Sequence, residues 1–170
     1  AIPRRRAAYS DRMAALLAKL SLLAYIAFED PDKKRLLDAT LTHGGLKLID
    51  AIAIDDTECI VVEAKDFLVV AFRGTTSKRD QKTDFRISIG RAEVENHPQH
   101  VRVHAGFYDA YKLVEQRLHA AISSVPGKSV YLTGHSLGGA VALVASAALG
   151  GRDDVGNRVA AVYTFGAPRV

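Results

Sequence analysis

The chain has 170 residues, of which 48% are hydrophobic and 25% are charged. This length fits one domain with a buried core, and the absence of repeats and low-complexity tracts excludes disordered, collagen-like and solenoid architectures. The formal net charge is +4, but Arg4, Arg5 and Arg6 supply three of these charges. The remaining balance gives no reason to expect a nucleic-acid partner.

Cys59 is the only cysteine, which excludes an intramolecular disulfide and a multi-cysteine metal site. We therefore expect a cytoplasmic protein, with secretion as the alternative, and no metal or organic cofactor. The longest apolar stretch, residues 13–28, is shorter than the roughly 20 residues of a membrane span. It lacks a small-residue cleavage site and has helical spacing, so it predicts an amphipathic helix rather than a signal peptide.

Three short strands are expected after this first helix, in the N-terminal half. Ser10 is a candidate N-cap for the helix, which we expect to end near Pro31. The apolar segments that follow predict strands over residues 46–54, 58–64 and 67–72. The last two are separated by Lys65 and Asp66 only, which indicates a hairpin.

The C-terminal half alternates helices and strands. Apolar residues at helical spacing predict a helix over residues 106–124, ended by Pro126 and Gly127. Residues 129–133 form a buried-looking strand, residues 136–149 an almost wholly apolar helix, and residues 159–165 another buried strand. The order strand, helix, strand predicts a parallel crossover whose helix covers a sheet face, and therefore an α/β fold.

The pentapeptide from Gly134 to Gly138, Gly-His-Ser-Leu-Gly, lies between a predicted strand and a predicted helix. This Gly-x-Ser-x-Gly pattern is typical of a nucleophile elbow, in which the glycines let strand and helix pass closely and the serine is exposed on a strained turn. The N–H of Leu137, at the helix N-terminus, is placed to donate to an oxyanion. His135 projects differently from its neighbour Ser136, so we expect it to have a packing role.

The same elbow resembles that of the class 3 lipases, the fungal-lipase-like family of α/β-hydrolases. Three further segments resemble family motifs in the same order: residues 72–75 (Phe-Arg-Gly-Thr), 103–107 (Val-His-Ala-Gly-Phe) and 163–170 (Tyr-Thr-Phe-Gly-Ala-Pro-Arg-Val). The resemblance implies an α/β-hydrolase fold, with a mostly parallel central sheet flanked by helices. It covers roughly residues 10–170, and we expect residues 1–170 to form a single domain of this fold.

The resemblance also implies roles for individual residues. Ser136 would be the acyl nucleophile, while Thr75 and Leu137 would donate backbone N–H groups to the oxyanion, with the Thr75 hydroxyl as a further donor. Arg73, His104 and Asp84 would support the loops around the site and would not take part in the reaction itself.

A general base is harder to assign. In α/β-hydrolases the triad runs Ser, then Asp or Glu, then His, yet the histidines all lie at or before the elbow, at positions 43, 97, 100, 104, 119 and 135. Asp153 and Asp154 follow a helix about 20 Å long that runs away from the elbow, so we expect them to lie far from Ser136. We expect a domain whose C-terminal strands, with the triad acid and base, are lacking, rather than a self-sufficient domain without a base.

These features predict a serine carboxylic-ester hydrolase, a lipase or esterase, acting on triacylglycerols or shorter esters through an acyl-enzyme. An inactive acyl-ligand-binding domain and a serine acyltransferase are the alternatives. The expected partner is a small-molecule ester or lipid, with at most transient contact with a lipid surface. The segment from Ser77 to Asp84, where the family has its lid, contains no large apolar residue, which predicts weak interfacial activation.

Overall fold

The computed structural model describes residues 9–75, 90–95, 97 and 99–170. Arg4, Arg5 and Arg6 lie outside these residues, and so does the segment from Ser77 to Asp84. The expected supporting role of Asp84 therefore stays a prediction. In the described part, the helices are α1 (Asp11–Leu23), α2 (Pro31–His43), α4 (Ala105–Ser123) and α5 (Leu137–Gly150), with a 3₁₀ turn, η1, at Gly156–Arg158. No helix in the described ranges is both long and apolar enough to cross a membrane.

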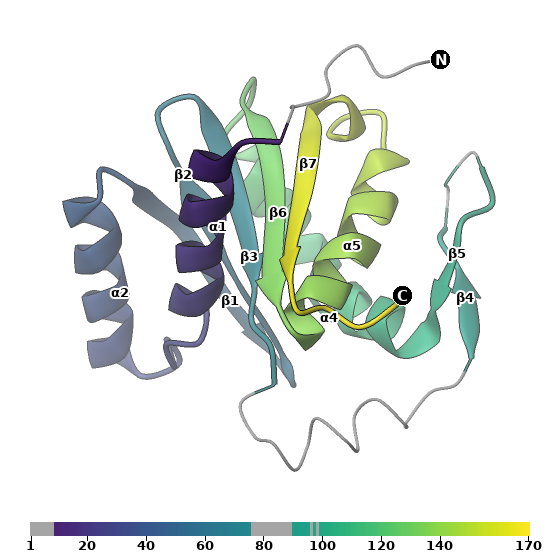
Figure 1. The fold of residues 1–170 in the computed structure, drawn as a ribbon, viewed down its shortest axis with the longest axis horizontal. Coiled ribbons are helices and arrows are strands. Elements are labelled where there is room, and N and C mark those ends of the chain that lie inside the picture. Colours follow the sequence, from purple (N-terminus) through teal and green to yellow (C-terminus); the bar gives the residue numbers. More distant parts are fainter. Residues whose placement is uncertain (1–8, 76–89, 96, 98) are drawn as a thin grey trace.

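A mixed sheet forms the centre of the molecule (Figure 1). Its strands lie in the order β1 (Lys47–Ile54), β2 (Thr57–Glu63), β3 (Phe67–Phe72), β6 (Ser129–His135) and β7 (Val159–Phe165). The first three strands pair antiparallel, whereas β3, β6 and β7 pair parallel. The parallel part contains the elbow, and it is connected through α4 and α5 as the alternation of strands and helices predicts.

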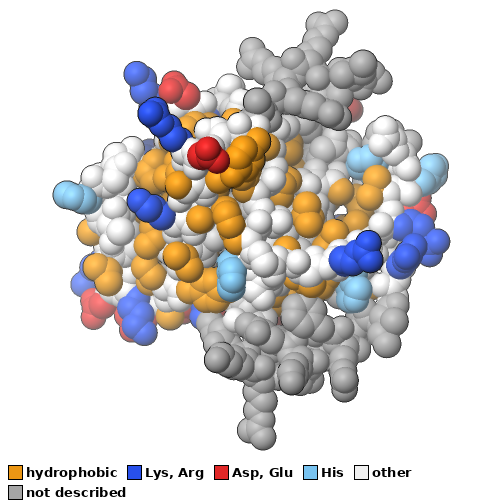
Figure 2. Space-filling view, in the orientation of Figure 1, with side chains coloured by type: hydrophobic (Ala, Val, Ile, Leu, Met, Phe, Trp, Pro, Cys, Tyr) orange, Lys and Arg blue, Asp and Glu red, His pale blue; other side chains and the backbone are white. Residues whose placement is uncertain are grey.

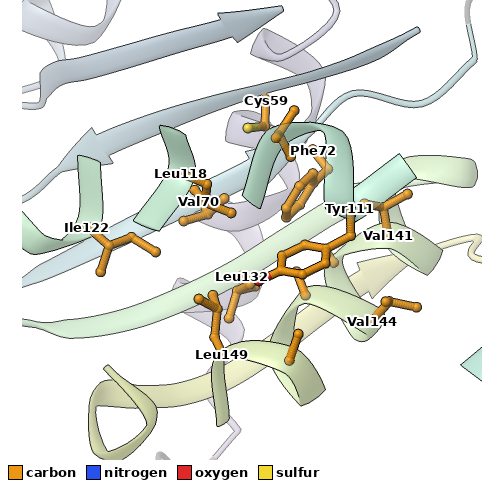
Figure 3. Packing of buried hydrophobic residues seen from close by; sticks show 14 of the residues in the cluster. Cys59, Val70, Phe72, Tyr111, Leu118, Ile122, Leu132, Val141, Val144 and Leu149 are labelled. Carbon is orange, nitrogen blue, oxygen red and sulfur yellow. The ribbon is translucent and has the colours of Figure 1, made fainter. Parts of the chain in front are cut away.

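Helices cover both faces of the sheet, and this produces two apolar layers. On one face α4 and α5 enclose a cluster in which Phe72, Tyr111 and Leu132 meet between helices and strands (Figure 3). On the other face α1 and α2 pack on the alternate strand residues, Ile60 and Val69 among them. The two clusters share the strands because successive side chains of a strand point to opposite faces. The architecture is that of an α/β fold with a three-layer arrangement.

The N-terminal part differs from the sequence prediction in one element. The first helix begins as expected, with the Ser10 side chain accepting from the Met13 N–H, but it ends at Leu23. A second helix, α2, begins at Pro31, where a helix stop was predicted. The prediction was wrong because Asp30 accepts hydrogen bonds from two backbone N–H groups and Pro31 occupies the first turn, and this combination starts a helix.

The other predicted elements are confirmed to within a few residues. The Ala64 N–H donates to the Phe67 carbonyl across Lys65 and Asp66, which closes the predicted hairpin. A small antiparallel pair, β4 (Arg91–Glu93) and β5 (Arg102–His104), was not predicted, because each strand has only three residues. Some hydrophobic side chains remain exposed on the face with α1 and α2, interspersed with charged ones (Figure 2).

Candidate active site

Ser136 lies between the end of β6 and the start of α5, and its backbone is strained. Its φ is 54° and its ψ is −127°, a conformation that non-glycine residues rarely adopt. Two hydrogen bonds hold it there: the Ser136 N–H donates to the Phe165 carbonyl at 2.9 Å, and the Gly139 N–H donates to the Ser136 carbonyl at 3.0 Å. This is the geometry of a nucleophile elbow.

The glycines around Ser136 allow this turn because backbone occupies the space of a side chain. A Cβ on Gly134 would overlap the Gly138 carbonyl and lie 2.6 Å from the Gly139 nitrogen. A Cβ on Gly139 would lie 2.8 Å from the Ala167 Cβ. The strand, the helix and the segment after β7 therefore meet at the elbow, and Gly166 to Pro168 returns to the site as the sequence predicts.

The segment after β3 lies against both flanks of the elbow. A Cβ on Gly138 would lie 2.7 Å from the Arg73 carbonyl oxygen, and a Cβ on Gly74 would lie 2.5 Å from the His135 carbonyl oxygen. Thr75, half-buried, follows Gly74 directly. Leu137 is the first residue of α5, where backbone N–H groups have no partner within the helix. The structure thus brings together the two segments from which oxyanion donors were predicted.

Arg73 is fixed by two carboxylates. Its guanidinium lies 3.1 Å from a Glu58 carboxylate oxygen and 3.2 Å from one of Glu29, and its backbone N–H donates to the Glu58 carbonyl at 2.9 Å. Burial raises the pKa of the Glu58 carboxyl, an effect that the Arg73 charge opposes. These contacts confirm that Arg73 supports the loop before Thr75.

His135 makes contacts consistent with the predicted packing role. Its Nδ1 lies 2.9 Å from the Tyr25 hydroxyl, and the two ring centroids are 5.9 Å apart. Burial raises the pKa of Tyr25, while a backbone hydrogen bond from Gly74 and the charge of Arg73 act in the opposite direction. Tyr25 follows α1 and therefore reaches the elbow from the N-terminal end of the chain.

His104 lies at the junction of β5 and α4, and its ring centroid is 4.5 Å from that of Phe107, with the two planes tilted by 31°. Its Nδ1 is buried and has no hydrogen-bond partner among the described residues. This ring contact is within the motif from Val103 to Phe107 and is with α4 rather than with the elbow, so the supporting role of His104 stays a prediction.

The described residues do not provide Ser136 with a base. Among them, no histidine or carboxylate forms a hydrogen bond with the Ser136 hydroxyl. Asp154 follows α5, at the opposite end from Ser136, and its carboxylate pairs with His119 Nε2 at 2.6 Å. Asp153 is exposed in the same turn. The expectation that both acids lie far from the site is confirmed.

Comparison with known sequences places these features in a family. The profile described as Lipase (class 3) matches residues 69–170, more than half of the chain. The chain belongs to the class 3 lipase family. The matched range includes the four motifs, while α1, α2, β1, β2 and the start of β3 precede it.

Two characterised relatives of this class 3 lipase chain come from fungi. A secreted mono- and diacylglycerol lipase 1 of Fusarium solani is 36% identical over 111 residues, which cover 63% of this chain and 31% of the relative. A lipase of Rhizomucor miehei is 32% identical over 125 residues, covering 69% of this chain and 33% of the relative. The chain thus matches about a third of the length of these curated relatives.

Solved structures agree with the α/β-hydrolase fold. Lipase II from Rhizopus niveus has a TM-score of 0.73 at 25% identity, over 93% of this chain and 62% of that one. The native lipase–propeptide complex of Rhizomucor miehei has a TM-score of 0.68 at 30% identity, over 97% of this chain and 56% of that one. The chain therefore has the fold of these lipases over most of its own length.

Sequence reasoning did not find three residues that contact the site loops: Tyr25, Glu29 and Glu58. None lies in a motif, and Tyr25 reads as one more apolar position at the end of the first helix. Their contacts join segments between 15 and 110 residues apart in the chain. No local pattern signals a pairing over such separations.

Proposed function

We propose that Ser136 is the nucleophile of a carboxylic-ester hydrolase, a lipase or esterase, that works through an acyl-enzyme. The observation that carries this proposal is the strained backbone of Ser136 between β6 and α5, at φ 54° and ψ −127°. Strain of this kind persists only where the surrounding structure enforces it, and it clusters at functional sites. Membership of the class 3 lipases supports the same activity.

In the proposed reaction the Ser136 Oγ attacks the ester carbonyl carbon, and a general base removes the hydroxyl proton. The carbonyl oxygen becomes an oxyanion, to which the backbone N–H groups of Thr75 and Leu137 donate. The carbon–oxygen bond of the ester then breaks, and the alcohol leaves with the proton from the base. Water attacks the acyl-enzyme in the same way, which releases the acid and restores the Ser136 hydroxyl.

This mechanism needs a base and an acid in addition to Ser136. By the family order both would follow the nucleophile in the chain. The relatives are about three times as long as the segments that match. Experiments on activity therefore use the full natural gene product that contains these 170 residues.

We infer that the substrates are acylglycerols or simpler carboxylic esters. The Fusarium solani relative is named a mono- and diacylglycerol lipase. The polar segment from Ser77 to Asp84 adds the expectation that soluble short-chain esters are hydrolysed at least as fast as long triglycerides. The same segment predicts weak interfacial activation. Hydrolysis rates of a short-chain ester below and above its solubility limit measure this activation, and a large increase in rate above the limit would contradict the prediction.

We also infer that the protein is secreted rather than cytoplasmic. The expectation of a cytoplasmic protein came from the single cysteine, but Cys59 is fully buried, so it carries no information on the redox compartment. Relatives from Fusarium solani and Gibberella zeae are named secreted lipases. Detection of the natural protein in culture medium, with a cytosolic marker absent, tests the inference.

Labelling with a fluorophosphonate probe tests the activity, because only an activated serine reacts at an appreciable rate. We expect the natural protein to be labelled once, at Ser136, and Ser136→Ala to abolish labelling and ester hydrolysis. Ser146→Ala is the matched control, since Ser146 lies on α5 and its hydroxyl donates only locally, to the Leu143 carbonyl. Ligand binding without labelling would indicate the acyl-binding alternative. Labelling with acyl transfer to an added alcohol in preference to water would indicate an acyltransferase.

A further inference from the structure

The turn that connects α1 and α2 contacts the active-site loops at two points. Tyr25 reaches Gly74 and His135, while Glu29 reaches Arg73. Tyr25 and Glu29 precede the range that the family profile matches, which begins at residue 69, whereas their partners lie within it. They join the segment with the proposed oxyanion donor Thr75 to the segment with the proposed nucleophile.

Tyr25 stands between these two segments. Its hydroxyl lies 2.9 Å from His135 Nδ1, one residue before Ser136. The same hydroxyl occupies the space into which a Gly74 side chain would extend, one residue before Thr75. Any residue other than glycine at position 74 would therefore displace the Tyr25 hydroxyl from this position.

The Tyr25 hydroxyl contacts both segments and can donate to one of them. Burial raises the pKa of Tyr25, so the phenol keeps its proton at neutral pH. It can donate this proton to His135 Nδ1 in the imidazole tautomer that has its own proton on Nε2. Tyr25 thus contacts the oxyanion segment, at Gly74, and hydrogen-bonds to the side chain beside Ser136.

The turn that presents Tyr25 is itself well ordered by backbone hydrogen bonds. The Tyr25 N–H donates to the Leu22 carbonyl, and the Ile26 N–H donates to the Leu23 carbonyl, each at 3.0 Å. Because the backbone of Tyr25 is fixed by these bonds, the residue loses less conformational freedom when its side chain bridges two segments. Such a bridge can keep the separation of the segments constant.

We propose that Tyr25 is a positioning residue that fixes the oxyanion segment, through Gly74, relative to the nucleophile elbow, through His135. The inference rests on the proposed function of Ser136 and extends it to a residue of the N-terminal turn. Catalysis by oxyanion stabilisation depends on donors placed in advance at the position of the developing charge. Loss of the bridge therefore lowers the rate of acylation without weakening the binding of the ester.

The test compares Tyr25→Phe with Tyr131→Phe in the full natural gene product. Tyr131 is a matched control because it lies four residues before His135 on β6, with its ring against Phe67. Removing one hydrogen bond corresponds to a rate decrease of roughly three- to tenfold. We expect Tyr25→Phe to lower kcat for a soluble p-nitrophenyl ester, and the rate of fluorophosphonate labelling, by this factor with KM unchanged. Tyr131→Phe should change neither.

A spectroscopic measurement tests the bridge without any need for turnover. The ¹⁵N chemical shifts of the imidazole, assigned with His135→Gln, distinguish an accepting Nδ1 from a protonated one. We expect the proton of neutral His135 to be on Nε2 in the natural protein, and to be shared between the two nitrogens in Tyr25→Phe. Circular dichroism and the Tm of each variant establish that it is folded.

A double-mutant cycle separates this role from general destabilisation. In a His135→Ala background, Tyr25→Phe should have a smaller effect on kcat than in the natural protein, because the two side chains act together. Equal kcat and labelling in Tyr25→Phe and the natural protein would overturn this inference alone. A natural protein that the probe does not label would overturn the proposed function, and this inference with it.

Discussion

Replacing Gly138 with alanine tests whether the oxyanion segment and the elbow helix are held at one fixed separation. A Cβ at this position would lie 2.7 Å from the Arg73 carbonyl oxygen and closer still to the Phe72 carbonyl oxygen. Side-chain Cβ atoms essentially never lie within 3.0 Å of such atoms. Because these neighbours are backbone, the end of β3 and the start of α5 must move apart.

The expected effect has two parts. Overpacking of this kind costs about 1–3 kcal/mol of the free energy of unfolding. The displacement also separates Thr75, after β3, from Leu137, on α5, and so widens the oxyanion site that we propose their N–H groups form. A misplacement of about 1 Å can lower a rate by about a hundredfold, so a shift of a few tenths of an ångström to 1 Å predicts an acylation rate lower by roughly ten- to a hundredfold.

Gly150→Ala is the matched control, since it makes the same change at the other end of α5. A Cβ on Gly150 meets nothing within 4 Å. Alanine is favoured over glycine in a helix by up to about 1 kcal/mol, so this variant should be as stable as the natural protein or more stable. Denaturant unfolding and the rate of fluorophosphonate labelling measure both variants. If Gly138→Ala matched the natural protein in both, close contact between the segments would not be what positions the donors.

Three further predictions concern stability and reactivity. Thr133→Val should lower the free energy of unfolding in urea by about 1–3 kcal/mol, because the buried Thr133 hydroxyl lies 2.8 Å from the Tyr163 carbonyl oxygen and 2.9 Å from the Ser21 hydroxyl, and its loss leaves buried polar groups without a partner; an unchanged midpoint would contradict this. Burial raises the pKa of the Cys59 thiol, so a thiol reagent should modify it only after denaturation, and rapid modification of the folded protein would argue against its burial. Burial also raises the pKa of Glu58 above its ordinary value of 4.5, so folding favours the protonated carboxyl; this stabilisation is complete below pH 4.5 and is lost as the pH rises through the raised pKa. Glu58→Gln should flatten this part of the pH profile of the unfolding free energy, and an identical profile would contradict the shift.

Local patterns in the sequence determine the elements around the elbow. Strand and helix periodicity predicts α4, β6, α5 and β7 close to their observed bounds. The glycines of the pentapeptide predict the sharp turn, because no other residue leaves room for two backbone segments at that distance. The helix α2 was missed for a local reason as well: Asp30 and Pro31 fit a helix start, but Pro31 was interpreted as a stop.

The sequence by itself therefore determined the elbow that contains Ser136, the order of strands and helices around it, and the family motifs, since each depends on residues that are neighbours in the chain. Only the tertiary structure decided what holds the site in place. Tyr25 meets His135 across 110 residues, and Arg73 meets Glu29 across 44. Such contacts depend on how α1 and the turn after it pack on the sheet. The packing of many side chains sets the position of this turn, and no pattern in the sequence near Tyr25 or Glu29 predicts it.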